Sequence, residues 1–130
     1  NKICIKFTAR ESHIMAENKK IGKYDFIEYF DDANVYKVSV NNIYKLINAD
    51  GEVLLEAEYI SDPILICNKY FQVVFKDSNW KYGLAYVNGY VIVKPKYDYM
   101  KYFGRSRYHV TVGGNIGIVT ATGEELISPK

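Results

Sequence analysis

The sequence has little of what a disulfide-stabilised, metal-binding or membrane-spanning protein needs. Its 130 residues include two cysteines, two histidines, three prolines and one tryptophan. Cys4 and Cys67 are far apart and neither belongs to a CxxC pair, so we expect two buried free thiols and no disulfide framework, zinc site or other cofactor. No apolar run approaches the roughly 20 residues of a membrane-spanning helix, so no membrane span is expected.

Strong charge of one sign is also missing. The formal net charge is +2, whereas a nucleic-acid-binding domain is expected to carry a strongly basic face. The charges are nevertheless divided along the chain: nine acidic residues oppose two lysines between positions 24 and 68, and eight basic residues oppose two aspartates between positions 69 and 110. This division is typical of an uneven solvated surface, and it alternatively predicts head-to-tail self-association. We expect a monomer, because surface charge mainly keeps proteins soluble.

What the sequence has instead is aromatic residues, with 13 tyrosines and 6 phenylalanines. Aromatic and β-branched residues favour strands over helices. A hydrophobic content of 48% excludes a disordered chain, and 130 residues are enough for a modest core. These features predict one folded all-β domain covering residues 1–130.

Internal repeats are the clearest pattern. Three segments superpose without a gap and each ends in a glycine: residues 44–51, 82–89 and 116–123. A tyrosine follows the first two of these glycines after eight residues, as Tyr59 and Tyr97. This offset predicts that the two tyrosines occupy the same position in successive repeats.

Two further blocks recur in the same order. The segment Tyr24–Phe30 matches Tyr97–Phe103, and a second set of matching segments consists of Tyr36–Val40, Phe71–Phe75 and Tyr108–Val112. Self-similarity at a period of about 36 residues indicates tandem repeats. The predicted boundaries are 1–35 for a degenerate first repeat, 36–70 for the second, 71–107 for the third and 108–130 for a partial fourth.

Each repeat has the chemistry of antiparallel strands. The recurring blocks alternate apolar and polar residues, as half-buried strands do. Asn-Gly between apolar runs predicts a hairpin in which both turn residues have positive φ, so turns are expected at Asp50-Gly51, Asn88-Gly89 and Thr122-Gly123. Return strands are predicted at 53–55, 91–93 and 125–127. Pro95 and Pro129 should end the ladder, because proline has no N–H to donate.

One repeat is therefore predicted to be a three-stranded antiparallel meander followed by an irregular aromatic segment. Repeats of this kind bury their apolar faces by stacking on their neighbours. The expected fold is all-β, with almost no helix and with the meanders stacked as a solenoid-like or propeller-like array.

The pattern Gly-(Leu/Ile)-x-x-x-x-Gly-x-x-apolar-apolar-x-Pro-x-Tyr-Asp resembles the WG repeat of bacterial proteins. Gly83 and Gly117 match the family's glycine position. The aromatic position before it, which is tryptophan in the family, holds Tyr44, Tyr82 and Ile116; Trp80 lies two residues before Tyr82 and does not match it. Other departures are Lys45 for the glycine and Ala57 and Gly22 for the proline. The resemblance implies a β-repeat architecture and no particular activity.

Catalytic groups are hard to assemble from this sequence. The sequence has only two histidines, His13 and His109, neither of which adjoins a cysteine, and His109 is expected to point outward from its strand. Asp31 and Asp32 lack the spacing of a calcium loop, and the glycines at 113–114 lack the Lys-Ser/Thr of a phosphate loop. We therefore expect solvated loops and turns at these positions, and no enzyme.

The densest candidate surface combines basic and aromatic side chains between residues 94 and 108. Tyr97 and Phe103 match Tyr24 and Phe30 and are therefore expected in the core. Rings that remain exposed could stack on a ligand while the cations hold an anionic group. The candidate binding residues are Trp80, Lys94, Lys96, Tyr99, Tyr102, Arg105 and Arg107.

The function predicted from these residues is a non-catalytic module that binds a protein or peptide through its tyrosine-rich surface. An alternative is the binding of a glycan or cell-envelope polymer through tyrosine and Trp80 platforms. Nucleic-acid binding by the segment from Lys94 to Arg107 is a weaker third hypothesis, because the net charge is small.

Overall fold

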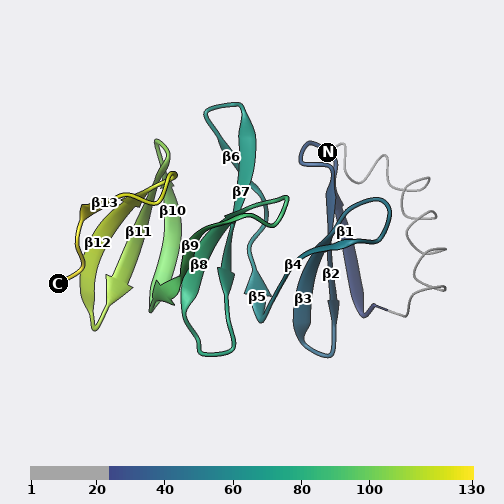
Figure 1. Cartoon of the computed structure of the whole chain (residues 1–130), viewed down its shortest axis with the longest axis horizontal. Helices are drawn as coiled ribbons and strands as arrows, with labels where there is room; N and C mark the ends of the chain where they lie inside the picture. Colours follow the sequence, from purple (N-terminus) through teal and green to yellow (C-terminus); the bar gives the residue numbers. More distant parts are fainter. Residues whose placement is uncertain (1–23) are drawn as a thin grey trace. The chain divides into compact units, whose positions relative to one another are not determined.

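The computed structural model describes residues 24–130, which form strands, turns and loops (Figure 1). The predictions for Cys4, His13 and the first 23 residues lie outside the described residues. Contacts divide the chain into two compact units, one ending at Glu56 and the other comprising Ala57–Lys130, and each is described by itself. The single-domain assignment stays a prediction. No helix in the described residues is long and apolar enough to cross a membrane.

Thirteen strands make up the described part of the chain. They are β1 (Phe26–Phe30), β2 (Val35–Val40), β3 (Ile43–Ile47), β4 (Val53–Ala57), β5 (Tyr59–Ile60), β6 (Ile64–Ile66), β7 (Tyr70–Lys76), β8 (Tyr82–Tyr86), β9 (Val91–Tyr97), β10 (Tyr99–Gly104), β11 (Arg107–Val112), β12 (Asn115–Thr120) and β13 (Glu125–Ile127). The all-β prediction is confirmed.

The strands form three sheets, which we call first, middle and last. Their orders are β1-β2-β3-β4, β5-β7-β8-β9 with β6 also paired to β7, and β10-β11-β12-β13. The prediction of three strands followed by an irregular segment is wrong in one respect. The aromatic segment is itself a strand, because β1, β5 with β6, and β10 each pair antiparallel with the strand that follows.

The hairpin turns lie at the predicted glycines. Gly51, Gly89 and Gly123 have φ of 85°, 99° and 94°, and each donates its N–H to the carbonyl three residues earlier, at 3.0, 2.9 and 2.9 Å. The preceding residues Asp50, Asn88 and Thr122 are not among those with positive φ. These loops therefore have three residues with a left-handed glycine, rather than the expected two-residue turn.

The other two glycines of the repeat motif serve close strand packing. A Cβ on Gly83 would lie 2.5 Å from the carbonyl oxygen of Val93 and 2.9 Å from the nitrogen of Pro95. On Gly117 it would lie 2.8 Å from the nitrogen of Pro129. The prediction that Pro95 ends its strand is wrong: β9 continues to Tyr97, and the β8–β9 register shifts nearby, where a bulge accommodates proline. Pro129 does lie beyond the end of β13.

Strand register corrects the sequence alignment of the middle copy. In each sheet the residue four positions before the turn glycine pairs with the second strand. These pairs are Ile47 with Tyr36, Ala85 with Val73, and Val119 with Tyr108. Val73, and not Phe71, is therefore the structural counterpart of Tyr36 and Tyr108.

The structural counterpart of Tyr59 also differs from the one that the sequence alignment predicts. The residue before it, Glu58, donates its N–H to Lys76, just as Asp98 donates its N–H to Thr111, at 2.9 and 2.8 Å. Tyr59 and Tyr99 are thus the first residues of equivalent strands. Tyr59 therefore corresponds to Tyr99 rather than to Tyr97.

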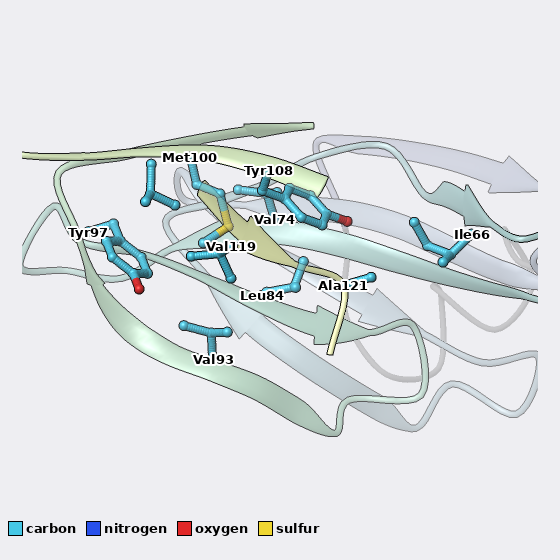
Figure 2. Close-up of a cluster of buried hydrophobic side chains, with 10 residues drawn as sticks. Ile66, Val74, Leu84, Val93, Tyr97, Met100, Tyr108, Val119 and Ala121 are labelled. Carbon is cyan, nitrogen blue, oxygen red and sulfur yellow. The ribbon is translucent and has the colours of Figure 1, made fainter. Parts of the chain in front are cut away.

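The middle and last sheets share one hydrophobic core. Figure 2 shows buried side chains from β7, β8 and β9 meeting those from β10, β11 and β12, including Leu84, Met100 and Val119. Gln72 is fully buried and joins the sheets: its amide donates to the carbonyl of Ala121 at 2.8 Å and accepts from the hydroxyl of Tyr108 at 2.9 Å. A separate cluster in the first sheet contains Tyr29, Tyr36, Val38 and Ile47.

Candidate functional site

The predicted binding residues lie on different elements of the second unit. Lys94 and Lys96 are exposed on β9 of the middle sheet, whereas Tyr99 and Tyr102 lie on β10 of the last sheet. Exposed Arg105 lies in the β10–β11 turn, exposed Arg107 begins β11, and Trp80 lies in the β7–β8 loop. The segment from 94 to 107 is therefore divided between two sheets and a turn rather than lying along one strand face.

Tyr99 begins β10, whereas Tyr102 lies within it, and the two side chains have different surroundings. The Tyr102 ring packs on Tyr108 with centroids 5.1 Å apart, and its hydroxyl accepts the N–H of Ser106 at 3.2 Å. Tyr99 instead contacts Tyr82. Tyr102 is thus largely structural, and Tyr99 belongs to a second group of rings.

That group is a row of three tyrosines, Tyr59, Tyr82 and Tyr99, which we call the aromatic row. The Tyr82 ring lies between the other two, in edge-to-face contact with Tyr59 at 6.4 Å and with Tyr99 at 5.5 Å between centroids. Such geometry is favourable for aromatic pairs. Tyr59 is 40% exposed and Tyr99 is 46% exposed, so the row presents ring surface to solvent.

Trp80 is joined to this row through Lys76. In the sheet, Lys76 pairs with Tyr59 on one side and with Tyr82 on the other. Its ammonium group lies 4.0 Å from the centroid of the Trp80 ring, within range of a cation–π interaction. Trp80 itself is 71% exposed, the largest exposed fraction among the large hydrophobic side chains of the described chain.

The chain neighbours of Tyr82 and Tyr99 form an ion pair. Lys81 donates to Asp98 at 2.6 Å, and the second carboxylate oxygen of Asp98 accepts the N–H of Gly113 at 2.8 Å. The hydrogen bond from Lys81, together with that from Gly113, lowers the pKa of Asp98 below its ordinary value of 3.8. Asp98 is therefore ionised near neutral pH and holds the β11–β12 turn.

Sequence reasoning missed Tyr59, Lys76 and Tyr82 as members of a surface. The sequence pattern aligns Tyr59 with Tyr97. Tyr97 is only 2% exposed, which agrees with its predicted place in the core. The correct alignment of Tyr59 with Tyr99 would have shown both as strand-initial tyrosines. No sequence pattern marks Lys76 as a surface residue of this site, because only cross-strand pairing places it between the two tyrosines.

Two burial predictions are wrong. Cys67 is exposed, in a turn where its φ is 53° and where its sulfur lies 3.3 Å from the Ser106 hydroxyl. Phe103 is 45% exposed, although its counterpart Phe30 is buried. A register shift between Tyr102 and Gly104 alters β10 at this point. Phe103 stacks on exposed His109, with ring centroids 4.0 Å apart, and the prediction that His109 points outward is confirmed.

No group of three or more His, Cys, Asp or Glu side chains within residues 24–130 is arranged to hold a metal ion. Comparison with protein-family models gives no match, and comparison with curated proteins gives none either. The aromatic row with Trp80, Lys76 and the Lys81–Asp98 pair is therefore the candidate site, on its geometry alone.

Proposed function

We propose that this chain is a non-catalytic interaction module that binds a peptide or protein segment on the aromatic row and Trp80. The observation that carries this proposal is the concentration of partly exposed tyrosine rings around Tyr82, next to a largely exposed tryptophan. Tyrosine and tryptophan are enriched in the centres of protein interfaces and among residues that dominate binding energy. A rigid sheet holds the rings in place before a ligand arrives, which reduces the entropy lost on binding.

We also propose that the chain is a divergent WG-repeat protein whose sheets stack as successive repeats. Support comes from the repeat glycines of the middle and last sheets. Gly83 lies against a return strand that contains Pro95, and Gly117 lies against a return strand that Pro129 follows. Further support is the equal strand order of the first and last sheets. The architecture suits an interaction module, because stacked repeats present an extended surface.

A glycan is the second candidate ligand. The exposed rings of Trp80 and Tyr99 favour it, because an amphipathic aromatic ring can contact the apolar face of a sugar while polar groups at its edge bind hydroxyls. Peptide binding remains the first proposal, since the rings of the row contact one another edge to face instead of presenting separate flat platforms.

The test is a parallel screen of the purified chain on a peptide array and on a glycan array. The informative variant is Tyr59→Ala/Tyr99→Ala, which removes the two exposed rings of the row. Tyr90→Ala is the matched control, because Tyr90 is also a largely exposed tyrosine but its ring lies beside Tyr86, in another cluster. Peptide signals that the control keeps and the double variant loses would support the proposal. Signals confined to glycans would replace it with the second candidate.

A further inference from the structure

Trp80 occupies a backbone position that is glycine in three other loops of this chain. The N–H of Trp80 donates to the carbonyl of Asp77 at 3.1 Å, and the N–H of Asp77 donates to the carbonyl of Lys81 at 3.0 Å. The loops that contain Gly51, Gly89 and Gly123 have the same two hydrogen bonds. The φ of Trp80 is 65°, in the left-handed region.

Neither the backbone nor burial favours tryptophan at this position. A bulky side chain in the left-handed region is a conformational outlier, whereas glycine adopts it without steric cost. Most of the Trp80 side chain is exposed and its ring contacts the ammonium group of Lys76, so burial contributes little to offset that cost. An outlier of this kind, held by a well-formed loop beside a cluster of exposed rings, points to a binding role.

The charges around Trp80 are already engaged within the protein. The ammonium of Lys76 lies over the indole ring, and Lys81 is paired with Asp98. In the loop itself, the carboxylate of Asp77 accepts the N–H groups of Asn79 and Lys81, so two cationic and two anionic groups are present. The surface thus offers ring area, the indole N–H and the hydroxyl groups of Tyr82 and Tyr99, rather than an excess of either charge. A ligand that matches it is uncharged, apolar and rich in hydrogen-bond acceptors.

We propose that Trp80 anchors an uncharged, proline-rich peptide in the polyproline II conformation, which lies along the aromatic row. This inference rests on the proposed function and specifies its ligand. A polyproline II helix has no internal hydrogen bonds, so its carbonyl groups can accept from the indole and tyrosine donors. Its rings are apolar and its backbone is already ordered, which suits recognition by an aromatic-lined surface.

The experiment uses the fact that Trp80 is the only tryptophan in the sequence. Its fluorescence emission is recorded while the whole chain is titrated with deca-proline, with a glycine-serine peptide of the same length, and with a chitin hexasaccharide. Deca-proline should produce a saturable blue shift, because the ligand removes the indole from water. The glycine-serine peptide should produce none at the same concentrations.

Calorimetry on two variants then assigns the effect to Trp80. Trp80→Gly should fold normally, because glycine suits the left-handed position, and should bind deca-proline at least about 30-fold more weakly, the loss expected on truncation of a dominant interface residue. Tyr90→Ala should bind as the unmodified chain does. Unchanged affinity of Trp80→Gly would overturn the role given to Trp80.

The outcomes separate this inference from the function on which it rests. If deca-proline does not bind while another peptide from the array requires the aromatic row, the proline-rich ligand is wrong and the peptide-binding function stands. If no peptide binds and the hexasaccharide shifts the emission, both are wrong and the glycan alternative replaces them.

Discussion

The first and last sheets have the same strand order but differ at the repeat glycine and at the proline that follows it in the repeat. Both contain a pair of tyrosines on neighbouring strands, Tyr29–Tyr36 and Tyr102–Tyr108, with ring centroids 4.6 and 5.1 Å apart. Both use an aspartate carboxylate to accept a turn N–H: Asp25 from Asn41 at 3.2 Å, and Asp98 from Gly113 at 2.8 Å. The repeat glycine, however, is Gly117 in the last sheet and is replaced by Lys45 in the first.

This difference shows that the sheet topology does not itself require glycine. Lys45 pairs with Val38 in a regular antiparallel register, and the return strand β4 contains no proline. In the last sheet the backbone and ring of Pro129 approach Gly117 so closely that a Cβ would meet them at 2.8 and 2.7 Å. The same Cβ would lie 2.4 Å from the carbonyl oxygen of Ile127, so Gly117 makes room for both the β13 backbone and Pro129. The first sheet lacks both the glycine and the proline.

The largest expected effect tests this difference. Gly117→Val should destabilise the protein by about 3 kcal/mol, because the new side chain overlaps the backbone near Pro129 and strands must move apart. Lys45→Val, at the matching position of the first sheet, should change stability by about 0.5 kcal/mol or less. Urea titration of both variants measures the two free energies of unfolding. Equal losses of stability would show that a valine is no worse tolerated at position 117 than at position 45.

A second expected effect concerns the turn glycines. Gly89→Val should destabilise by about 1 to 3 kcal/mol, since valine is strained at a φ of 99°. Trp80→Gly, at the same loop position between β7 and β8, should have the opposite sign and raise the thermal midpoint. Scanning calorimetry on both variants measures the two thermal midpoints. A lower midpoint for Trp80→Gly would mean that the exposed indole stabilises the fold.

The tyrosine pairs of the two sheets can be compared by removing one hydroxyl group from each and measuring the loss of stability. Tyr108→Phe should cost about 1.5 kcal/mol, because it leaves the fully buried Gln72 side chain without a donor to its oxygen. Tyr29→Phe should cost about 0.5 to 1 kcal/mol, since the bond from its hydroxyl to Asn34 is only partly buried. Denaturant titrations should rank the two in this order, and the reverse ranking would contradict the role given to Gln72.

A further expected effect appears in alkali. Burial raises the pKa of Tyr97, aided by its hydrogen bond to Glu125, and burial also raises the pKa of Tyr108. Because the folded chain holds these protons more tightly than the unfolded chain, their contribution to stability is complete below the ordinary tyrosine pKa of 10.0 and declines as pH rises above it.

The measurement is the urea midpoint at a series of pH values between neutrality and about pH 11. The unmodified chain should lose stability above about pH 10, and Tyr97→Phe/Tyr108→Phe should lose less over the same interval. Parallel curves for the two proteins would show that other groups cause the decline.

Local sequence patterns are enough to predict the hairpin strands of each repeat and the places where the chain reverses. Tyr36–Val40, the glycines at 51, 89 and 123, and the return strands are all where their local chemistry puts them. Alternation and glycine act over a few residues, so they can be recognised without a fold. The burial of Tyr97 and the exposure of His109 follow from the same local patterns.

The pairing of the strands and the exposure of the rings depend instead on tertiary contacts. The aromatic segments that form β1, β5 and β10 are strands because a neighbouring strand is available to pair with each of them. Bulges around Pro95 and near Gly104 shift the register, which alters the counterpart of Tyr59 and turns Phe103 outward. The placement of Lys76 between Tyr59 and Tyr82, and so the candidate site, is set by the register of strand pairing, which no local pattern encodes.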